Sequence, residues 1–428
     1  MRSPSRAPSS PLFVAESIDD RLAAAGLPPL PRAAWLEIDV GALANNVAVF
    51  REIVGPGVEL GAVVKADGYG HGLKSAALAF QSAGADRLCV ASLDEALALR
   101  DTGVTLPILV LFSAPLSLLN DAAAARVDVT VSDPAWLGAL PAAWRGEDWV
   151  GELGVHVEVE TGLSRGGFVP DKVAEAFAAL SRLPAVRVTG IWTHMATAED
   201  EAVTAGQIAA FDGAVESVRA AGLTVPPRHV AATGGLLTGR APAYEGVRVG
   251  LGVYGLQPLD LPIPAHLHPM ADRLQPAMAL KCRAVRVESL PAGTRVSYGG
   301  RWQAERESVI ATLPVGYGDA IPRPAPWGEA LVRGRRVPLV GTVAMDAVMA
   351  DVTDVPGITP EDEFVLLGRQ GDEEITAEQL ARARNTIPWE VATGMSYRLP
   401  RVYHAGSVLM GMRTLNADTS GTEGNRAK

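Results

Sequence analysis

The sequence predicts an α/β protein, with an N-terminal (β/α)8 barrel of the TIM type followed by a mainly β C-terminal domain. Up to about residue 270, short apolar runs alternate with alanine-rich segments of helical periodicity. Beyond that point, strand-like runs follow one another with few helices between them. The length of 428 residues is sufficient for one large domain and a second one.

The expected barrel strands are eight runs rich in Val, Ile and Leu. They are residues 60–66, 87–92, 107–112, 127–132, 153–160, 186–194, 229–234 and 247–255. Helix-like segments lie between them, such as 93–103, which ends at a glycine, and 170–183, which begins with a proline and an aspartate. Eight alternating β and α units predict a closed barrel, with a doubly wound sheet as the alternative.

The expected domain boundaries follow from this change of pattern. We assign residues 33–270 to the barrel and 271–415 to the β domain, whose strands are expected in 278–290, 294–300, 308–317, 329–343, 347–354 and 363–368. One short helix is expected at 376–385. The run 35–40 has no preceding partner, so pairing with the β domain is an alternative for it. Residues 1–32 and 416–428 are predicted to be a disordered extension and a disordered tail.

Composition narrows the function classes. Hydrophobic residues make up 48% and charged residues 20%, and 38 basic against 48 acidic side chains give a net charge of −10. With no long basic run, neither nucleic acid nor an anionic membrane surface is an expected partner. Cys89 and Cys282 fit no metal spacing and no disulfide framework, which favours a reducing compartment and no metal site. No apolar run reaches signal-peptide or membrane-spanning length, so we expect a cytoplasmic protein.

The stretch VVKADGYGHG at 63–72 places a lysine where a buried strand ends. Glycines at 68, 70 and 72 then open a permissive turn. A buried ammonium group is costly, so either Lys65 extends to water or its pKa is lowered and it takes part in chemistry.

Further polar residues follow the other predicted strands at the same end, where barrel enzymes place their active sites. Each has an ordinary structural explanation on its own, such as a surface arginine or a buried histidine, but their shared placement favours a site. The set comprises Lys65 after the first strand, Arg165 after the fifth, His194 after the sixth, Thr233, Gly234 and Gly235 after the seventh, and Arg248 and Gly250 along the eighth.

Three of these features together indicate pyridoxal 5'-phosphate (PLP). The glycines near the last two strands can present backbone N–H groups to a phosphate. Lys65 could form a Schiff base, and Arg248 could face a heteroaromatic nitrogen. A lysine-dependent aldolase barrel would share the first two features but would not need the arginine.

At this point the sequence resembles the alanine racemases, which are PLP enzymes of fold type III. The resemblance covers residues 33–415 and rests on VVKADGYGHG, VEVETGLSRGGF, GIWTHMATAED, RVGLGVYG, VSYGG, PVGYGD, VGTVAMD and PRVY, in the family's order. It implies a (β/α)8 barrel followed by a β domain. It also implies a homodimer in which each active site uses residues from both chains.

The resemblance also implies roles for individual residues. Lys65 corresponds to the Schiff-base lysine and one of two catalytic bases, and Tyr298 to the second base, supplied across the dimer interface. Two bases are needed because inversion removes a proton from one face of the substrate and returns it to the other. The cofactor ligands implied are Tyr69, Thr233, Gly250 and Leu251 at the phosphate, His194 beside the ring and Arg248 at the pyridine nitrogen. The substrate-side residues implied are Arg165, Tyr317, Met345 and Asp346.

Two positions depart from the family pattern. Glu158 stands where many members have a carbamylated lysine, so it could orient Arg165 without added CO2, and the alternative is a strand carboxylate that faces solvent. Trp389 stands where members often have a tyrosine that contacts the phosphate and narrows the substrate entrance. Indole offers one donor and more bulk, so phosphate contact is expected but the substrate size preference stays open.

The expected function is alanine racemase, an isomerase that interconverts L- and D-alanine and supplies D-alanine for peptidoglycan if the source is a bacterium. Three alternatives stay open. A serine or broad-spectrum racemase is compatible with Trp389. A PLP decarboxylase of related fold would need an acidic residue where Arg248 stands, and a non-catalytic PLP-binding barrel would lack the β domain and Tyr298.

Overall fold

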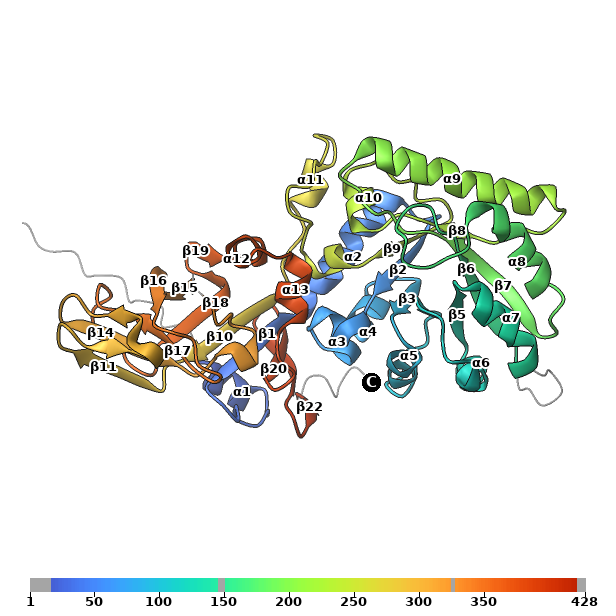
Figure 1. The fold of residues 1–428 in the computed structure, drawn as a ribbon. Coiled ribbons are helices and arrows are strands. Elements are labelled where there is room, and N and C mark those ends of the chain that lie inside the picture. Colours follow the sequence, from blue (N-terminus) through green and yellow to red (C-terminus); the bar gives the residue numbers. More distant parts are fainter. Residues whose placement is uncertain (1–16, 145–150, 325–327, 422–428) are drawn as a thin grey trace, which may run out of the picture.

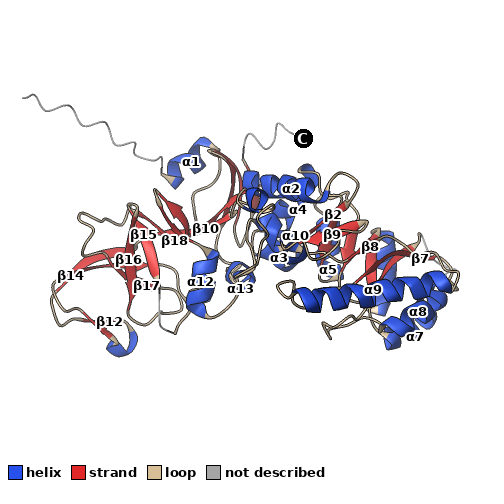
Figure 2. Ribbon diagram, turned by 90° about the horizontal axis from the view of Figure 1, so that it is seen from above, coloured by secondary structure: helices blue, strands red, loops and turns tan. Residues whose placement is uncertain are grey.

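The computed structural model describes residues 17–144, 151–324 and 328–421. Two bodies lie end to end, with the barrel at the right of Figure 1 and the β domain at the left. Helices α12 (Ala377–Arg384) and α13 (Pro388–Thr393) lie where the two bodies meet, in both views (Figures 1 and 2). Within these described ranges, no helix has the length and apolar character needed to cross a membrane.

Eight parallel strands close the barrel, and each overlaps one of the predicted runs. They are β2 (Glu59–Val63), β3 (Arg87–Val90), β4 (Ile108–Val110), β5 (Val127–Val131), β6 (Leu153–Glu158), β7 (Val186–Trp192), β8 (Arg228–His229) and β9 (Gly246–Val249). Pairing of β2 with β9 completes the ring, so the closed barrel is confirmed and the doubly wound alternative is wrong.

Helices cover the outside of the barrel, and α7, α8 and α9 flank β7 in Figure 2. The barrel helices are α2 (Val40–Val54), α4 (Leu73–Ser82), α5 (Leu93–Arg100), α6 (Leu119–Ala124), α7 (Pro134–Ala143), α8 (Val173–Leu180), α9 (Glu201–Ala220) and α10 (Thr233–Leu237). Aspartates 39, 133 and 200 cap α2, α7 and α9, because their side chains accept hydrogen bonds from first-turn N–H groups. The segment predicted at 170–183 begins with the 3-10 turn η2 (Pro170–Lys172) before α8.

The β domain is built on one long, mainly antiparallel sheet. Its strand order is β11-β14-β17-β16-β15-β18-β10-β1-β20-β21-β22, and β19 pairs with β18. The strands are β10 (Met278–Arg283), β11 (Arg286–Leu290), β14 (Ser308–Leu313), β15 (Glu329–Val332), β16 (Arg335–Val340), β17 (Val348–Asp351), β18 (Glu363–Gln370), β19 (Glu373–Ile375), β20 (Arg401–Ala405), β21 (Val408–Arg413) and β22 (Asp418–Ser420). A separate pair, β12 (Arg295–Val296) and β13 (Trp302–Gln303), leads into and out of the VSYGG motif.

Strand β1 (Ala34–Asp39) belongs to the β domain. It runs antiparallel to β10 and parallel to β20, which is the alternative that the sequence left open for the run 35–40. From β1 the chain therefore leaves the β domain, enters the barrel through α2 and returns at β10.

The predicted disorder of both termini is wrong for the described residues there. Helix α1 (Ile18–Ala24) buries Ile18 and Leu22 against a cluster that includes Trp35 and Val402, so residues 17–32 cover one face of the sheet. Strand β22 pairs with β21 and orders residues 418–420 of the predicted tail. Burial of a few apolar side chains against distant strands stabilises the first segment, and backbone pairing with β21 orders the second. The predictions for residues 1–16 and 422–428 lie outside the described residues.

Candidate active site

A pocket of about 360 Å³ opens at the carboxyl ends of the barrel strands. It brings together eleven of the residues predicted from the sequence. They are Lys65, Tyr69, Arg165, His194, Thr233, Gly234, Gly235, Arg248, Gly250, Leu251 and Trp389. A wider groove of about 890 Å³ lies between barrel and β domain, but its lysine, Lys281, is already paired with Glu37 and Glu363.

Lys65 begins a left-handed turn, α3 (Lys65–Tyr69), rather than a loose glycine loop. Ala66, Asp67 and Tyr69 have φ between 51 and 56°, a region that costs a residue with a side chain about 1–2 kcal/mol each. Tertiary contacts hold this strained backbone. Arg413 donates two hydrogen bonds to the Asp67 carboxylate at 2.6 and 2.7 Å, and Glu95 accepts from the Ala66 N–H at 2.7 Å.

The surroundings of Lys65 make its neutral amine more accessible than that of an exposed lysine, because they lower its pKa. Burial lowers the pKa of Lys65, and the positive charges of Arg165 and Arg248 lower it further, while Glu95 acts in the opposite direction. A neutral amine at a strand end is a nucleophile and a base. Of the two interpretations of this lysine, the geometry therefore supports the chemical one.

Arg248 is fixed in the wall of the pocket. It is 4% exposed and lies over the Trp192 ring at 4.5 Å. Its guanidinium donates to the carbonyls of His229 and Thr193 at 2.6 and 2.8 Å. Burial lowers the pKa of Arg248 to about 10, so the group stays charged at neutral pH.

A directional chain of hydrogen bonds continues from Arg248 into the barrel. Because arginine only donates, His229 must accept at Nδ1, 2.7 Å from Arg248 Nη1. His229 then carries its proton on Nε2 and donates it to His156 Nδ1 at 2.7 Å. His156 in turn donates from Nε2 to Asp128 at 3.2 Å, where Arg87 also donates at 2.9 Å. The chain fixes the tautomer of both imidazoles.

Sequence reasoning missed His229, His156 and Asp128 as parts of the site. They lie at the start of, or inside, the strand runs HVAATG, LGVHVEVE and VDVTVS rather than at the carboxyl ends, where the site was expected. The signal that could have found them is a polar side chain in a strand that is buried on both faces. Gly190 makes the room, because a Cβ there would lie 2.1 Å from His156 Nδ1.

His194 lies beside Arg248 as a neutral imidazole. Arg248 Nη2 is 3.3 Å from His194 Nδ1, which must therefore be the acceptor. Burial lowers the pKa of His194 to about 3, with further contributions from Arg248 and Arg165. His194 can accept or donate a hydrogen bond at neutral pH but does not add charge.

The opposite wall offers a cradle for an anionic group. Thr233 begins α10 and its hydroxyl accepts from the Gly252 N–H at 3.0 Å, while Gly250 and Leu251 lead into the turn η3 (Leu251–Tyr254). A Cβ at Gly250 would lie 2.5 Å from the Tyr69 hydroxyl, so only glycine allows this approach. The hydroxyls of Tyr69 and Thr233, together with the close-packed backbone at Gly250 and Leu251, are groups that could bind a phosphate.

Glu158 faces Arg165 and is 5% exposed, so the solvent-facing alternative is wrong. Glu158 Oε1 lies 3.5 Å from Arg165 Nη2. Burial raises the pKa of Glu158, and the positive charge of Arg165 opposes that rise. Arg165 also lies over the Phe112 ring at 5.5 Å, so two groups orient it.

Four predicted residues lie away from this pocket. Tyr298, Tyr317 and Met345 are 68%, 42% and 53% exposed on the β domain. Asp346 is paired with Arg398 at 2.7 Å. In the described part of the chain none of these four lines the pocket of Lys65.

Comparison with known proteins assigns the family. The fold is a closed barrel followed by a β domain, and its strand-end pocket holds the half-buried amine of Lys65. The family model of the alanine racemase N-terminal domain matches residues 38–258, and that of the C-terminal domain matches 277–403. The alanine racemases of Desulfosudis oleivorans and Symbiobacterium thermophilum are each 39% identical, covering 88% and 87% of this chain and 97% of each relative. The chain belongs to the alanine racemase family.

Solved structures agree with this assignment. The crystal structure of alanine racemase from Bacillus anthracis with bound L-Ala-P has a TM-score of 0.83 at 32% identity, and covers 90% of this chain and 99% of that one. The alanine racemase from a D-cycloserine-producing Streptomyces lavendulae has a TM-score of 0.79 at 35% identity, covering 88% and 98%.

Proposed function

We propose that this chain interconverts L-alanine and D-alanine by proton transfer at two faces of the substrate, with PLP as cofactor. The observation that carries the proposal is Lys65, a buried amine at a strand end whose pKa is lowered by burial and by Arg165. PLP, when bound, would supply an electron-withdrawing ring that makes the Cα proton acidic.

The pocket provides a complementary group for each part of PLP. Tyr69, Thr233, Gly250 and Leu251 would hold the phosphate, with Trp389 at its edge, and His194 would lie beside the ring. Arg248 would donate to the ring nitrogen, and its pKa of about 10 means that it would keep its own proton there. The chain through His229 and His156 would hold the Arg248 guanidinium in place.

Lys65 would hold and return the proton on one face of the substrate, and Tyr298 of the partner subunit would serve the other. A homodimer with shared sites is supported by the exposure of Tyr298, Tyr317 and Met345 in the single chain. Arg165 would bind the substrate carboxylate, oriented by Glu158 without added CO2. Within the described residues no cluster suits a metal ion, and the chemistry requires none.

We place the enzyme in the cytoplasm, where the buried thiols of Cys89 and Cys282 would stay reduced. Its D-alanine would serve peptidoglycan synthesis in a bacterial source. A broader substrate range is the second candidate, because Trp389 lines the pocket where its bulk would set the space for a side chain.

Incubation of the holoenzyme with L-alanine, L-serine and L-lysine, followed by chiral chromatography and a CO2 assay, tests the proposal. D-alanine without CO2 is the expected product. Faster formation of D-serine than of D-alanine would favour the broader racemase, and CO2 from lysine would favour a decarboxylase. A Trp389→Tyr variant would show whether the indole sets the ratio of alanine to serine turnover.

A further inference from the structure

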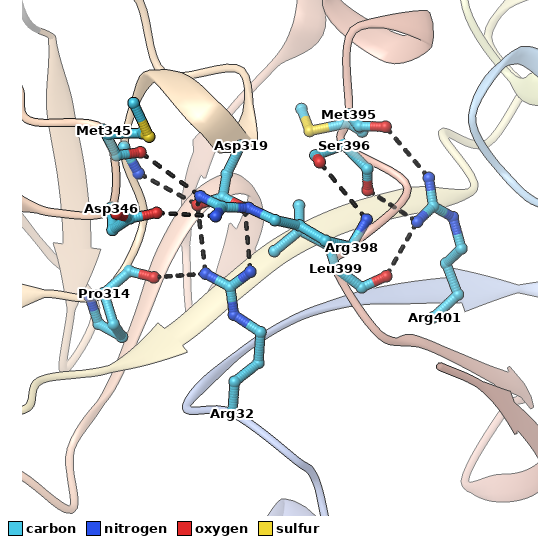
Figure 3. Close-up of polar contacts among 11 residues, drawn as sticks. Arg32, Pro314, Asp319, Met345, Asp346, Met395, Ser396, Arg398, Leu399 and Arg401 are labelled. Carbon is cyan, nitrogen blue, oxygen red and sulfur yellow. Dashed lines mark hydrogen bonds and ion pairs between the residues drawn. The ribbon is translucent and has the colours of Figure 1, made fainter. Parts of the chain in front are cut away.

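Asp319 is the buried centre of a charge cluster in the β domain, whose other members are partly exposed (Figure 3). It ends the turn η5 (Tyr317–Asp319) and its side chain is 0% exposed. Arg32 donates to both carboxylate oxygens at 3.0 and 3.2 Å, and Arg398 does the same at 2.8 and 2.9 Å. One carboxylate is therefore held by two bidentate arginines, the strongest geometry for such a pair.

The same two arginines reach the neighbouring loops. Arg398 Nη1 lies 2.7 Å from the Asp346 carboxylate, and Nη2 is 3.4 Å from the Met345 carbonyl. Arg32 donates to the Pro314 carbonyl at 2.9 Å. Two arginines and two aspartates make the cluster neutral, and its bonds tie residues 314–319 to residues 345–346.

Backbone contacts join these two loops directly. Tyr317 N–H donates to the Ala344 carbonyl at 3.0 Å, and Gly318 N–H donates to the Met345 carbonyl at 2.9 Å. A Cβ at Gly316 would lie 2.2 Å from the Ala344 carbonyl oxygen, so glycine is needed for this approach. The two loops therefore form one structural unit that includes the buried Asp319.

The outer face of this unit is open. Tyr317 and Met345 are 42% and 53% exposed, whereas Asp319 in the same unit is fully buried. Burial of a carboxylate costs free energy that its arginine partners do little more than offset, so the ion pairs of Asp319 are better explained by the geometry that they fix. Arg32 also lies ahead of the family-model match, which begins at residue 38.

We propose that Asp319 is a positioning residue, braced by Arg32 and Arg398, that sets Tyr317, Met345 and Asp346 against the substrate in the partner's pocket. The inference rests on the proposed function, in which these residues meet the substrate across a dimer interface. It also gives the N-terminal segment a role in activity.

Arg32→Gln tests the proposal, with Arg32→Lys as the conservative variant and Arg333→Gln as the matched control. Arg333 also makes a bidentate pair, with Asp362 at 2.6 and 2.9 Å, and also donates to two backbone carbonyls. Loss of the Arg32 hydrogen bonds to Asp319 should raise KM for L-alanine about tenfold, because a small displacement of the two loops weakens their contacts with the substrate. The visible absorption of the bound cofactor and the dimer mass should not change.

The Arg333→Gln control should keep KM within about twofold of wild type, even if it lowers the melting temperature as much as Arg32→Gln does. Arg32→Lys should recover part of the loss. Asp319→Asn, measured by the same kinetics, should raise KM for L-alanine more than Arg32→Gln does. An unchanged KM in Arg32→Gln, or equal KM changes in Arg32→Gln and the control, would overturn the inference. A wild-type holoenzyme that does not racemise alanine would instead overturn the proposed function.

Discussion

Glu158 and Arg165 form an ion pair in the wall of the pocket, with Glu158 Oε1 3.5 Å from Arg165 Nη2. The carboxylate is buried, whereas the guanidinium side chain is 38% exposed and can reach a ligand. In the proposed function this carboxylate would orient Arg165 without added CO2. Three consequences of the site can be tested before the shared-site claim itself.

Glu158→Gln keeps the shape of the side chain and removes its charge. We expect KM for L-alanine to rise about tenfold, since a charge-assisted hydrogen bond is roughly twice as strong as a neutral one. Because burial raises the pKa of Glu158, the wild type should lose affinity as pH falls, when Arg165 loses its charged partner. Steady-state kinetics measured at a series of pH values should show KM for L-alanine rising toward acid pH in the wild type but not in the variant.

Added bicarbonate is the control for this prediction. It should leave wild-type activity unchanged, because glutamate needs no CO2. Activity that rises with bicarbonate would point to a carbamylated lysine elsewhere and contradict the role given to Glu158.

The lowered pKa of Lys65 can be measured on the cofactor-free protein by competitive labelling of amines with acetic anhydride, read by mass spectrometry. Lys65 should become reactive at lower pH than an exposed lysine such as Lys172. Arg165→Gln should move the Lys65 midpoint toward higher pH, because removal of a nearby positive charge stabilises the ammonium form. A midpoint that Arg165→Gln leaves in place would contradict the contribution of Arg165 to this lowered pKa.

The hydrogen-bond chain from Arg248 predicts the tautomer of two histidines. A neutron structure should show hydrogen on Nε2 of both His229 and His156 and none on their Nδ1 atoms. Burial lowers the pKa of both residues, that of His229 well below its usual value, so this arrangement should be present at neutral pH. Hydrogen on His229 Nδ1 would contradict the chain, because that atom faces an arginine that can only donate.

Much of the fold and pocket could be predicted because both follow from local pattern. Alternating apolar runs predict the barrel, and the carboxyl ends of parallel strands meet on one face. Lys65, Arg165, His194 and Thr233 therefore converge in the structure as the sequence indicated.

The rest depends on contacts between distant parts of the chain. The left-handed turn after Lys65 is held by Arg413, which lies 346 residues from Asp67 in sequence. The sequence predicted disorder in the segment that forms helix α1. Seven residues are too few for a stable isolated helix, and α1 is stable because Ile18 and Leu22 are buried against the sheet. Tyr298 could be connected to the pocket only through a resemblance, since one chain does not bring the two together.

Complementation between two inactive variants tests the shared active site most directly. Lys65→Ala and Tyr298→Phe homodimers should each be nearly inactive, because every site lacks one base. In a differently tagged heterodimer of the two, one site carries both defects and the other combines intact Lys65 with intact Tyr298. Racemase activity should therefore reappear, at about one working site per dimer. A verified heterodimer that stays as inactive as its parents would contradict the account, because it would place both bases in the same chain.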